Sequence, residues 1–255
     1  MSFQHIRTEM AGGVGSIILN RPPVNILNIE MMEEINQALQ GFKGEEGLKI
    51  LVLRAEGKAF SAGVDVEEHL GDTMKKMIET FHGMFRLMDE LQAPSVAVVN
   101  GSALGGGCEL ALYCDMVLAT ERSTFGQPEV MVGVFPPIAA LVFPRIIGRK
   151  KAMELILSGK TVGARDALEM GLINRIVSED SMEEEVKQFV GDIARHSAVV
   201  LRLTKKATIE GLCDDAEGGL RRIERIYLDE LMRTEDATEG LKSFLEKRKP
   251  VWRNK

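Results

Sequence analysis

Three consecutive glycines, Gly105-Gly106-Gly107, run directly into a helical pattern and constrain this chain more than any other feature. The pattern continues with apolar residues such as Leu110 and Ala111. Because glycine has no Cβ, the backbone N–H groups of such a turn can approach a ligand closely. The turn is therefore suited to binding an oxyanion.

Two glutamates lie close to this turn in the sequence. Glu109 follows the glycines, and Glu129 ends the segment Phe125-Gly126-Gln127-Pro128-Glu129. A carboxyl beside the turn can pass a proton to or from a substrate whose carbonyl oxygen is bound there. Two nearby carboxylates also push their titrations apart, which would leave one of them protonated near neutrality. The alternative is a pair of surface glutamates that stabilise helix N-termini.

Size and charge narrow the class of protein. A chain of 255 residues fits one large domain, or a core with a small appendage. The net charge of −6 argues against a nucleic-acid partner. The N-terminus lacks the features of a signal peptide, and no apolar run approaches the length that spans a bilayer. We therefore expect a cytoplasmic protein without a membrane partner.

The cysteines and histidines give no sign of a metal site. The three cysteines show no CxxC spacing and are odd in number, so we expect ordinary thiols; they are Cys108, Cys114 and Cys213. The four histidines have no ligand spacing.

Short β-rich runs alternate with helical stretches, which is the pattern of an α/β protein. The predicted strands are Ser16–Leu19, Ile50–Arg54, Ser95–Val99 and Met116–Ala119. Asn28 is placed to cap a helix that continues to Phe42, and a methionine-rich apolar stripe predicts a second helix from Met74 to Met88. We expect both apolar stripes to be core.

The strand pattern stops at about Met182, and helical segments follow at Glu217–Met232 and Glu235–Arg248. We therefore predict two regions. Residues 1–195 would form the core, which binds substrate and carries out the chemistry. Residues 196–255 would form a helical C-terminal region at an oligomer interface.

Several motifs occur in one order along the whole chain. They are Leu19-Asn20-Arg21-Pro22, Lys58-Ala59-Phe60-Ser61-Ala62-Gly63-Val64-Asp65, Ala97-Val98-Val99-Asn100-Gly101, the triple glycine, Phe125-Gly126-Gln127-Pro128-Glu129 and Phe244-Leu245-Glu246-Lys247-Arg248-Lys249. In this the chain resembles the enoyl-CoA hydratase/isomerase, or crotonase, superfamily. The resemblance implies a crotonase-like spiral of ββα units with a helical C-terminal trimerisation region, assembled as a homotrimer or a dimer of trimers.

The resemblance also implies roles for individual residues. The backbone N–H groups of Val64 and Gly106 would bind the thioester oxygen of an acyl-CoA, because such donors stabilise the charge that develops there. Both glutamates are present, as in the hydratases of the superfamily. Glu109 would act chiefly as the base that deprotonates water, and Glu129 would supply the proton to carbon.

Coenzyme A would enter as part of the substrate, and no separate cofactor is expected. The residues that the resemblance places along the coenzyme A are Lys58, Ser61, Ala62, Asp65 and Gly105. The phosphates of coenzyme A need local cations in an acidic protein. Candidates by position are Arg54, Lys58, Lys247, Arg248 and Lys249.

One segment departs from the pattern of common hydratases. Where they carry Pro-Gly-x-Gly-Gly-Thr-Gln-Arg-Leu, this chain has the stiffer, more apolar run from Pro136 to Arg145. The chain also resembles cyclohexa-1,5-diene-1-carbonyl-CoA hydratases of anaerobic aromatic degradation. This resemblance is carried by Val134-Phe135-Pro136-Pro137, by Phe143-Pro144-Arg145 and by the early segment Asn25-Ile26-Leu27-Asn28-Ile29-Glu30-Met31-Met32. The sequence therefore favours an acyl-CoA hydratase that adds water to an unsaturated thioester, with a cyclic diene as substrate.

Three alternatives stay open at this point. The first is a straight-chain enoyl-CoA hydratase of the β-oxidation type, and the second is an enoyl-CoA isomerase, which would move a double bond without adding oxygen. The third is a crotonase-like protein that binds acyl-CoA or RNA without catalysis. The two intact glutamates argue against the third.

Overall fold

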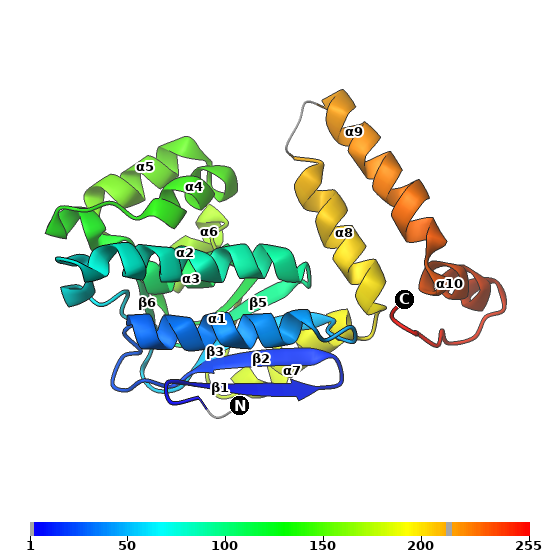
Figure 1. Ribbon diagram of the computed structural model, residues 1–255, viewed down its shortest axis with the longest axis horizontal. Helices are drawn as coiled ribbons and strands as arrows, with labels where there is room; N and C mark the ends of the chain where they lie inside the picture. The colour runs from blue at the N-terminus through cyan, green and yellow to red at the C-terminus, as the bar shows by residue number, and fades with distance from the viewer. Residues whose placement is uncertain (1–2, 213–215) are drawn as a thin grey trace.

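Strands alternate between two sheets along most of the chain in the computed structural model, which describes residues 3–212 and 216–255 (Figure 1). The larger sheet has the order β1-β2-β3-β5-β7-β10, and the smaller has the order β4-β6-β8-β9. The larger sheet consists of β1 (Ile6–Ala11), β2 (Val14–Leu19), β3 (Ile50–Ala55), β5 (Ser95–Val99), β7 (Met116–Thr120) and β10 (Arg175–Val177). The smaller consists of β4 (Ala59–Ser61), β6 (Ser102–Leu104), β8 (Thr124–Gly126) and β9 (Thr161–Gly163).

A ββα unit repeats along the chain, with one strand in each sheet before the helix. The three repeats are β3-β4-α2, β5-β6-α3 and β7-β8-α4, where α2 is Thr73–Leu91, α3 is Gly106–Tyr113 and α4 is Pro137–Ile146. The paired strands of successive repeats are parallel in both sheets. A short 3₁₀ helix precedes α2 (η1, Glu67–His69) and another precedes α4 (η2, Pro128–Val132). The predicted α/β class and the spiral of ββα units are confirmed.

The remaining helices cover the sheets or follow them in the chain. They are α1 (Ile29–Lys43), α5 (Gly148–Ser158), α6 (Ala164–Met170), α7 (Met182–Ala194), α8 (Ala198–Glu210), α9 (Ala216–Arg225), the π-helical turn η3 (Ile226–Glu230), the 3₁₀ turn η4 (Leu231–Arg233) and α10 (Glu235–Leu245). All four predicted strands are confirmed, with small differences at their ends.

The first helix forms as its sequence predicts. The Asn28 side chain accepts a hydrogen bond from the Met31 N–H over 3.1 Å, which satisfies one of the free donors at the start of α1. The apolar face of α1 is buried, and this helix packs against α2. The methionines of α2 are core from Met77 onward, whereas Met74 is 52% exposed and lies outside the core stripe.

The segment predicted to be helical over Glu217–Met232 is helical, but its second half is not α-helix. The regular helix ends at Arg225 and continues as the π-helical and 3₁₀ turns η3 and η4. Ile226 is buried at this point, and Lys206 of α8 donates to both carboxylate oxygens of Glu230 over 2.6 Å. These tertiary contacts fix the irregular turn, and local periodicity does not encode them.

Helices α8, α9 and α10 form an arm beside the layered core, and α9 and α10 lie farthest from it (Figure 1). Two side chains of α8 attach it to the core. The Lys205 Nζ lies 2.8 Å from the Asp115 carboxylate and donates to the Ala93 carbonyl over 3.2 Å, and Arg202 donates to the Glu46 carbonyl over 3.1 Å. The predicted boundary at residues 195 and 196 falls between α7 and α8. The division into two regions and the trimeric assembly stay predictions.

No helix within the described ranges, 3–212 and 216–255, has the length and apolar character needed to cross a membrane.

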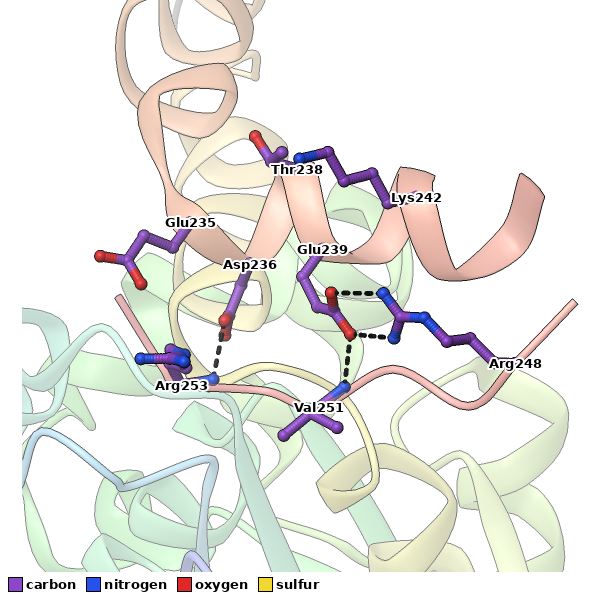
Figure 2. A pocket seen from close by; sticks show the side chains of 8 residues that line it. All are labelled: Glu235, Asp236, Thr238, Glu239, Lys242, Arg248, Val251 and Arg253. Carbon is purple, nitrogen blue, oxygen red and sulfur yellow. Dashed lines mark hydrogen bonds and ion pairs between the residues drawn. The ribbon is translucent and has the colours of Figure 1, made fainter. Parts of the chain in front are cut away.

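The last six residues, 250–255, form a strap that a buried carboxylate holds against the arm. Asp236 is 1% exposed and accepts hydrogen bonds from the Ser197 hydroxyl and from the N–H groups of Arg253 and Asn254, at 2.7 and 2.8 Å for the two amides. Figure 2 shows the contact between Asp236 and the strap. Since these bonds link the end of the chain to the start of α8, Asp236 fixes the shape of the arm.

Replacement of Asp236 by alanine should release the strap. Hydrogen bonds to a charged group contribute about 1.5–3 kcal/mol each, so the loss of even one predicts about tenfold faster amide exchange or more. Hydrogen exchange at Arg253 and Asn254 measures the effect. The Glu235→Ala variant is the matched control, because Glu235 lies on the same helix and pairs only loosely with Lys255 at 3.5 Å. Equal protection in both variants would contradict the role of Asp236.

Candidate active site

The triple glycine forms the turn between β6 and α3. Gly105 has a φ of +50°, a conformation that L side chains rarely adopt, and its N–H donates to the Gly126 carbonyl over 2.9 Å. Gly106 is the first residue of α3. Its N–H therefore has no acceptor within the helix and stays available at the positive end of the helix dipole.

A second backbone segment brings Val64 next to this turn. The Leu27 N–H donates to the Gly63 carbonyl over 2.9 Å, and the Asp65 N–H donates to the Leu27 carbonyl over 3.0 Å. In this parallel bridge the neighbours of Val64 make both hydrogen bonds, so the N–H of Val64 points away from Leu27. A Cβ added to Gly106 would lie 2.5 Å from Cγ2 of Val64. The structure thus brings together the two residues whose amides were predicted to bind the thioester oxygen.

Glu109 lies in the first turn of α3 and is 2% exposed. The Ala139 N–H, in the first turn of α4, donates to its Oε1 over 2.7 Å. Burial raises the pKa of Glu109 to about 8, the Ala139 and Ile138 amides oppose this shift, and the charge of Glu129 adds to it. Glu109 is therefore a carboxyl that changes protonation near neutral pH.

Glu129 lies in η2 on the other side of the glycine turn. A Cβ added to Gly105 would lie 2.9 Å from Oε1 of Glu129, so the carboxyl lies directly against the turn. Burial raises the pKa of Glu129 to about 7. The buried Gln127 amide, with its nitrogen turned toward Glu129, donates to both carboxylate oxygens over 3.1 Å. Two carboxyls of raised pKa and two amides of adjacent turns can hold a carbonyl oxygen and move protons beside it.

The sequence profile described as enoyl-CoA hydratase/isomerase matches residues 9–255. The chain belongs to this family. A probable enoyl-CoA hydratase of Rhizobium meliloti is 37% identical over 258 residues, with 100% of both chains covered. A cyclohexa-1,5-dienecarbonyl-CoA hydratase of Thauera aromatica is 36% identical, over 97% of this chain and 95% of that one. The crystal structure of an enoyl-CoA hydratase from Bacillus anthracis matches with a TM-score of 0.93 at 30% identity, over 99% of this chain and 100% of that one.

These matches confirm the resemblance to the enoyl-CoA hydratase/isomerase family and the crotonase-like fold. The relatives are named as hydratases, which are lyases, so the expectation of a hydratase-type enzyme is confirmed as well. The substrate in this family is an acyl-CoA. The roles of Val64, Gly106, Glu109 and Glu129 stay predictions, which the geometry above supports.

The residues predicted along the coenzyme A differ in accessibility. Lys58 and Ala62 are exposed, Asp65 is half-buried, and Gly105 and Ser61 are buried. Ser61 is 0% exposed and its hydroxyl donates to the Asn25 carbonyl over 2.7 Å, so this side chain faces the interior. The 0% exposure covers the whole residue, so neither the side chain nor the backbone of Ser61 is exposed for the predicted contact with coenzyme A. These contacts stay predictions.

Two of the cations predicted to bind phosphate are already engaged by carboxylates. Arg54 donates to Glu183 over 3.1 Å. Arg248 binds both oxygens of Glu239, at 2.5 and 2.9 Å, and holds the pKa of Glu239 well below its usual range, at about 2 (Figure 2). A phosphate would have to displace these partners, so they are weaker candidates than the exposed Lys58.

The arm contains a surface cavity of about 630 Å³ that lies apart from the two glutamates. Its lining residues are Glu235, Asp236, Thr238, Glu239, Lys242, Arg248, Val251 and Arg253 (Figure 2). The carboxylates of this lining are engaged within the arm, because Glu239 pairs with Arg248 and Asp236 holds the strap. We therefore take the glycine turn, and not this cavity, as the candidate active site.

Sequence reasoning missed two side chains that support the site. Asn25 has a φ of +52° and is 1% exposed, and its amide donates to the carbonyls of Glu56 and Ala59 over 2.9 Å. Gln127 lies inside a motif that was quoted for its glutamate alone. The signal for Asn25 was its residue type, since asparagine tolerates the left-handed conformation of turns better than most residues.

The described cysteines are unsuited to nucleophilic catalysis. Cys108 and Cys114 are free and buried, and burial raises the pKa of both thiols, to about 12 for Cys114. Cys213 lies outside the described residues. Among residues 3–212 and 216–255, no three side chains of His, Cys, Asp or Glu gather into a group that could hold a metal ion.

The raised pKa values of Glu109 and Glu129 predict a stability that falls with pH. Unfolded, both carboxyls ionise near 4.5, whereas in the fold they keep their protons until about pH 8 and about pH 7. The contribution of the two carboxyls to the free energy of unfolding is fully present below pH 4.5. It is lost as the pH rises through the folded pKa values, because between pH 4.5 and about pH 8 the folded state binds more protons than the unfolded state.

Glutamine at both positions should remove this loss, since it does not ionise. We expect the melting temperature of the double variant to rise relative to wild type between about pH 5 and pH 8. The exposed Glu79, replaced by glutamine, serves as the control. If the difference in melting temperature between the double variant and the wild type stays constant over this pH range, the two carboxyls have ordinary pKa values and the prediction is wrong.

Proposed function

We propose that the chain is an acyl-CoA hydratase that adds water to the double bond of an unsaturated acyl-CoA thioester. One observation carries this proposal: the neighbouring residues Val64 and Gly106 lie beside the buried Glu109 and the half-buried Glu129, whose pKa values are about 8 and about 7. An isomerase needs to move a proton between carbons, whereas hydration needs one group to deprotonate water and another to protonate carbon. Two titrating carboxyls suit the second task.

The proposed reaction begins with the thioester oxygen bound by the two amides. Glu109 takes a proton from water, and the water oxygen attacks the carbon β to the carbonyl. The electrons of the double bond move to the thioester oxygen, where the Val64 and Gly106 N–H groups stabilise the developing charge. Glu129 then gives its proton to the α carbon, so that one molecule of water is added in all. Coenzyme A takes part only as a portion of the substrate.

The acid and base assignments rest on different surroundings. The carboxylate of Glu109 accepts the Ala139 amide at the start of α4, and such an amide favours the ionised form that a base requires. Glu129 lies against Gly105, next to the bound carbonyl in the proposed complex, where a proton donor to the adjacent carbon has to be.

We further propose that the acyl group is a cyclic conjugated diene, cyclohexa-1,5-diene-1-carbonyl. The support is the Thauera aromatica relative that bears this name and the segment from Pro136 to Arg145, which lacks the glycines of common hydratases. In the fold this segment starts α4 with Pro136 and Pro137, and Ile138 and Ala139 are buried beside Glu109. A stiff apolar wall suits a rigid ring better than a flexible chain.

Exchange of either glutamate for glutamine should lower kcat by roughly 10²–10⁴ with little change in KM, because glutamine keeps the shape of the side chain but transfers no proton. The measurement is the rate of water addition to the best acyl-CoA. Glu121→Gln is the control, since Glu121 is exposed and pairs with Arg165 outside the site. Near-full activity in both site variants would contradict the mechanism.

The acyl group is tested by mass spectrometry of products after the protein is mixed with crotonyl-CoA, a longer trans-2-enoyl-CoA and cyclohexa-1,5-diene-1-carbonyl-CoA. We expect the cyclic diene to gain one water at the highest rate, because the stiff segment disfavours flexible chains. A preference for the linear thioesters would instead indicate β-oxidation-type hydration. A rearranged double bond without a gain in mass would indicate an isomerase.

A further inference from the structure

Ser61, at the end of β4, makes two hydrogen bonds within the protein through its hydroxyl. Its side chain is 0% exposed, and the hydroxyl donates to the Asn25 carbonyl over 2.7 Å. The same hydroxyl oxygen accepts the Gly63 N–H over 3.2 Å. Ser61 therefore holds the residue that directly precedes Val64.

The same side chain also supports the glycine turn. A Cβ added to Gly107 would lie 2.4 Å from Cβ and 2.6 Å from Oγ of Ser61, distances that real Cβ atoms do not reach. The first turn of α3 thus packs directly on Ser61, with no space for a side chain between them. Gly107 directly follows Gly106, so Ser61 contacts both backbone segments that carry the proposed thioester donors.

The acceptor of the Ser61 hydroxyl is itself fixed. Asn25 is 1% exposed, and its side chain accepts the Arg21 N–H over 2.7 Å and donates to the carbonyls of Glu56 and Ala59. These bonds tie the turn at Asn25 to the ends of β3 and β4. Because the Asn25 carbonyl is fixed, the Ser61 hydroxyl donates in one direction only. The lone pairs of the hydroxyl oxygen then face the Gly63 N–H.

We propose that Ser61 is a positioning residue that sets the separation and direction of the Val64 and Gly106 amides. This inference rests on the proposed function, in which those amides bind the thioester oxygen. Donors of this kind act on charge that develops in the transition state, so a small displacement lowers kcat more than it weakens binding. Ser61 would not touch the substrate through its side chain.

The test compares Ser61→Ala with Ser123→Ala, which removes a closely matched hydroxyl. Ser123 is also 0% exposed, donates to the Val99 carbonyl over 2.8 Å and accepts the Gly101 N–H over 3.3 Å. Ser123 lies between β7 and β8 in the chain, and none of its hydrogen bonds involves the segment that carries Val64. Ser123→Ala should lose at least as much thermal stability as Ser61→Ala, because the Ser123 hydroxyl also accepts the Thr120 N–H over 3.1 Å and that donor loses its partner as well.

We expect Ser61→Ala to lower kcat about tenfold with KM changed less than about twofold, whereas Ser123→Ala should keep kcat within about twofold. Ser61→Cys, whose thiol is a weaker donor and acceptor, should give an intermediate kcat and replaces the alanine variant should that one fail to fold. Equal kcat values in the Ser61 and Ser123 variants would overturn the inference.

A second measurement does not depend on turnover. The infrared C=O stretch of bound butyryl-CoA, labelled with ¹³C at the thioester carbon, reports the hydrogen bonds to the oxygen of a thioester that cannot be hydrated. Wild type and Ser123→Ala should lower this frequency equally, and Ser61→Ala should reverse part of the shift. An unchanged frequency in Ser61→Ala would overturn the inference, as would the absence of any shift in wild type. The wild type could lower the frequency, and Ser61→Ala could reverse part of that shift, although the protein hydrates no acyl-CoA. This result would refute the proposed function and leave the inference about Ser61 standing.

Discussion

The parallel pairing of β4, β6 and β8 is the constraint on which the candidate site depends. Each of these strands ends in the segment that carries one part of the site: β4 leads to Val64, β6 to Gly106 and Glu109, and β8 to Glu129. Since parallel strands end at the same edge of a sheet, three segments far apart in sequence meet there without long loops. The larger sheet and the helices fix this small sheet. The Gly105 N–H donates to the Gly126 carbonyl and joins the ends of β6 and β8, and the Gly63 N–H donates to the Ser61 hydroxyl and fixes the segment that leaves β4.

The electrostatics of the site follow from the same geometry. Burial against the glycine turn removes water from Glu109 and Glu129 and raises both pKa values, which destabilises the fold at neutral pH. The hydrophobic core and the hydrogen bonds of the spiral must offset this cost. The few polar contacts of the carboxyls, the Ala139 amide to Glu109 and the Gln127 amide to Glu129, orient them without neutralising their charge. Titration near neutrality is thus a property of position, since a glutamate in water ionises near 4.5.

How much the sequence predicted depended on the length of each signal. Four strands of the larger sheet, β2, β3, β5 and β7, and the helices α1 and α2 were predicted because their apolar patterns extend over several residues. The edge strands β1 and β10 were not predicted, because β1 is exposed at all but its first residue and β10 has three residues. The strands of the smaller sheet have three residues each, too few for any periodicity, so the sheet that builds the site was not read from pattern alone. The direction of individual side chains could not be predicted either, because it depends on contacts between distant parts of the chain. Ser61 faces Asn25, and Arg54 pairs with Glu183. The glycine and glutamate motifs were informative since their residue types carry the chemistry directly.

The start of α4 links the choice of substrate to the chemistry. The segment that replaces the glycines of common hydratases also supplies the Ala139 amide that holds Glu109, only three residues after Pro136. The ring of Pro137 fixes its φ angle, and Pro137 has no N–H of its own, so the first donors of the helix come from the residues that follow. A change that reshapes this wall for another acyl group therefore also moves the donor that favours the ionised form of the proposed base. In the proposed mechanism, substrate preference and proton transfer therefore depend on the same few backbone atoms, and they are expected to change together when the segment changes.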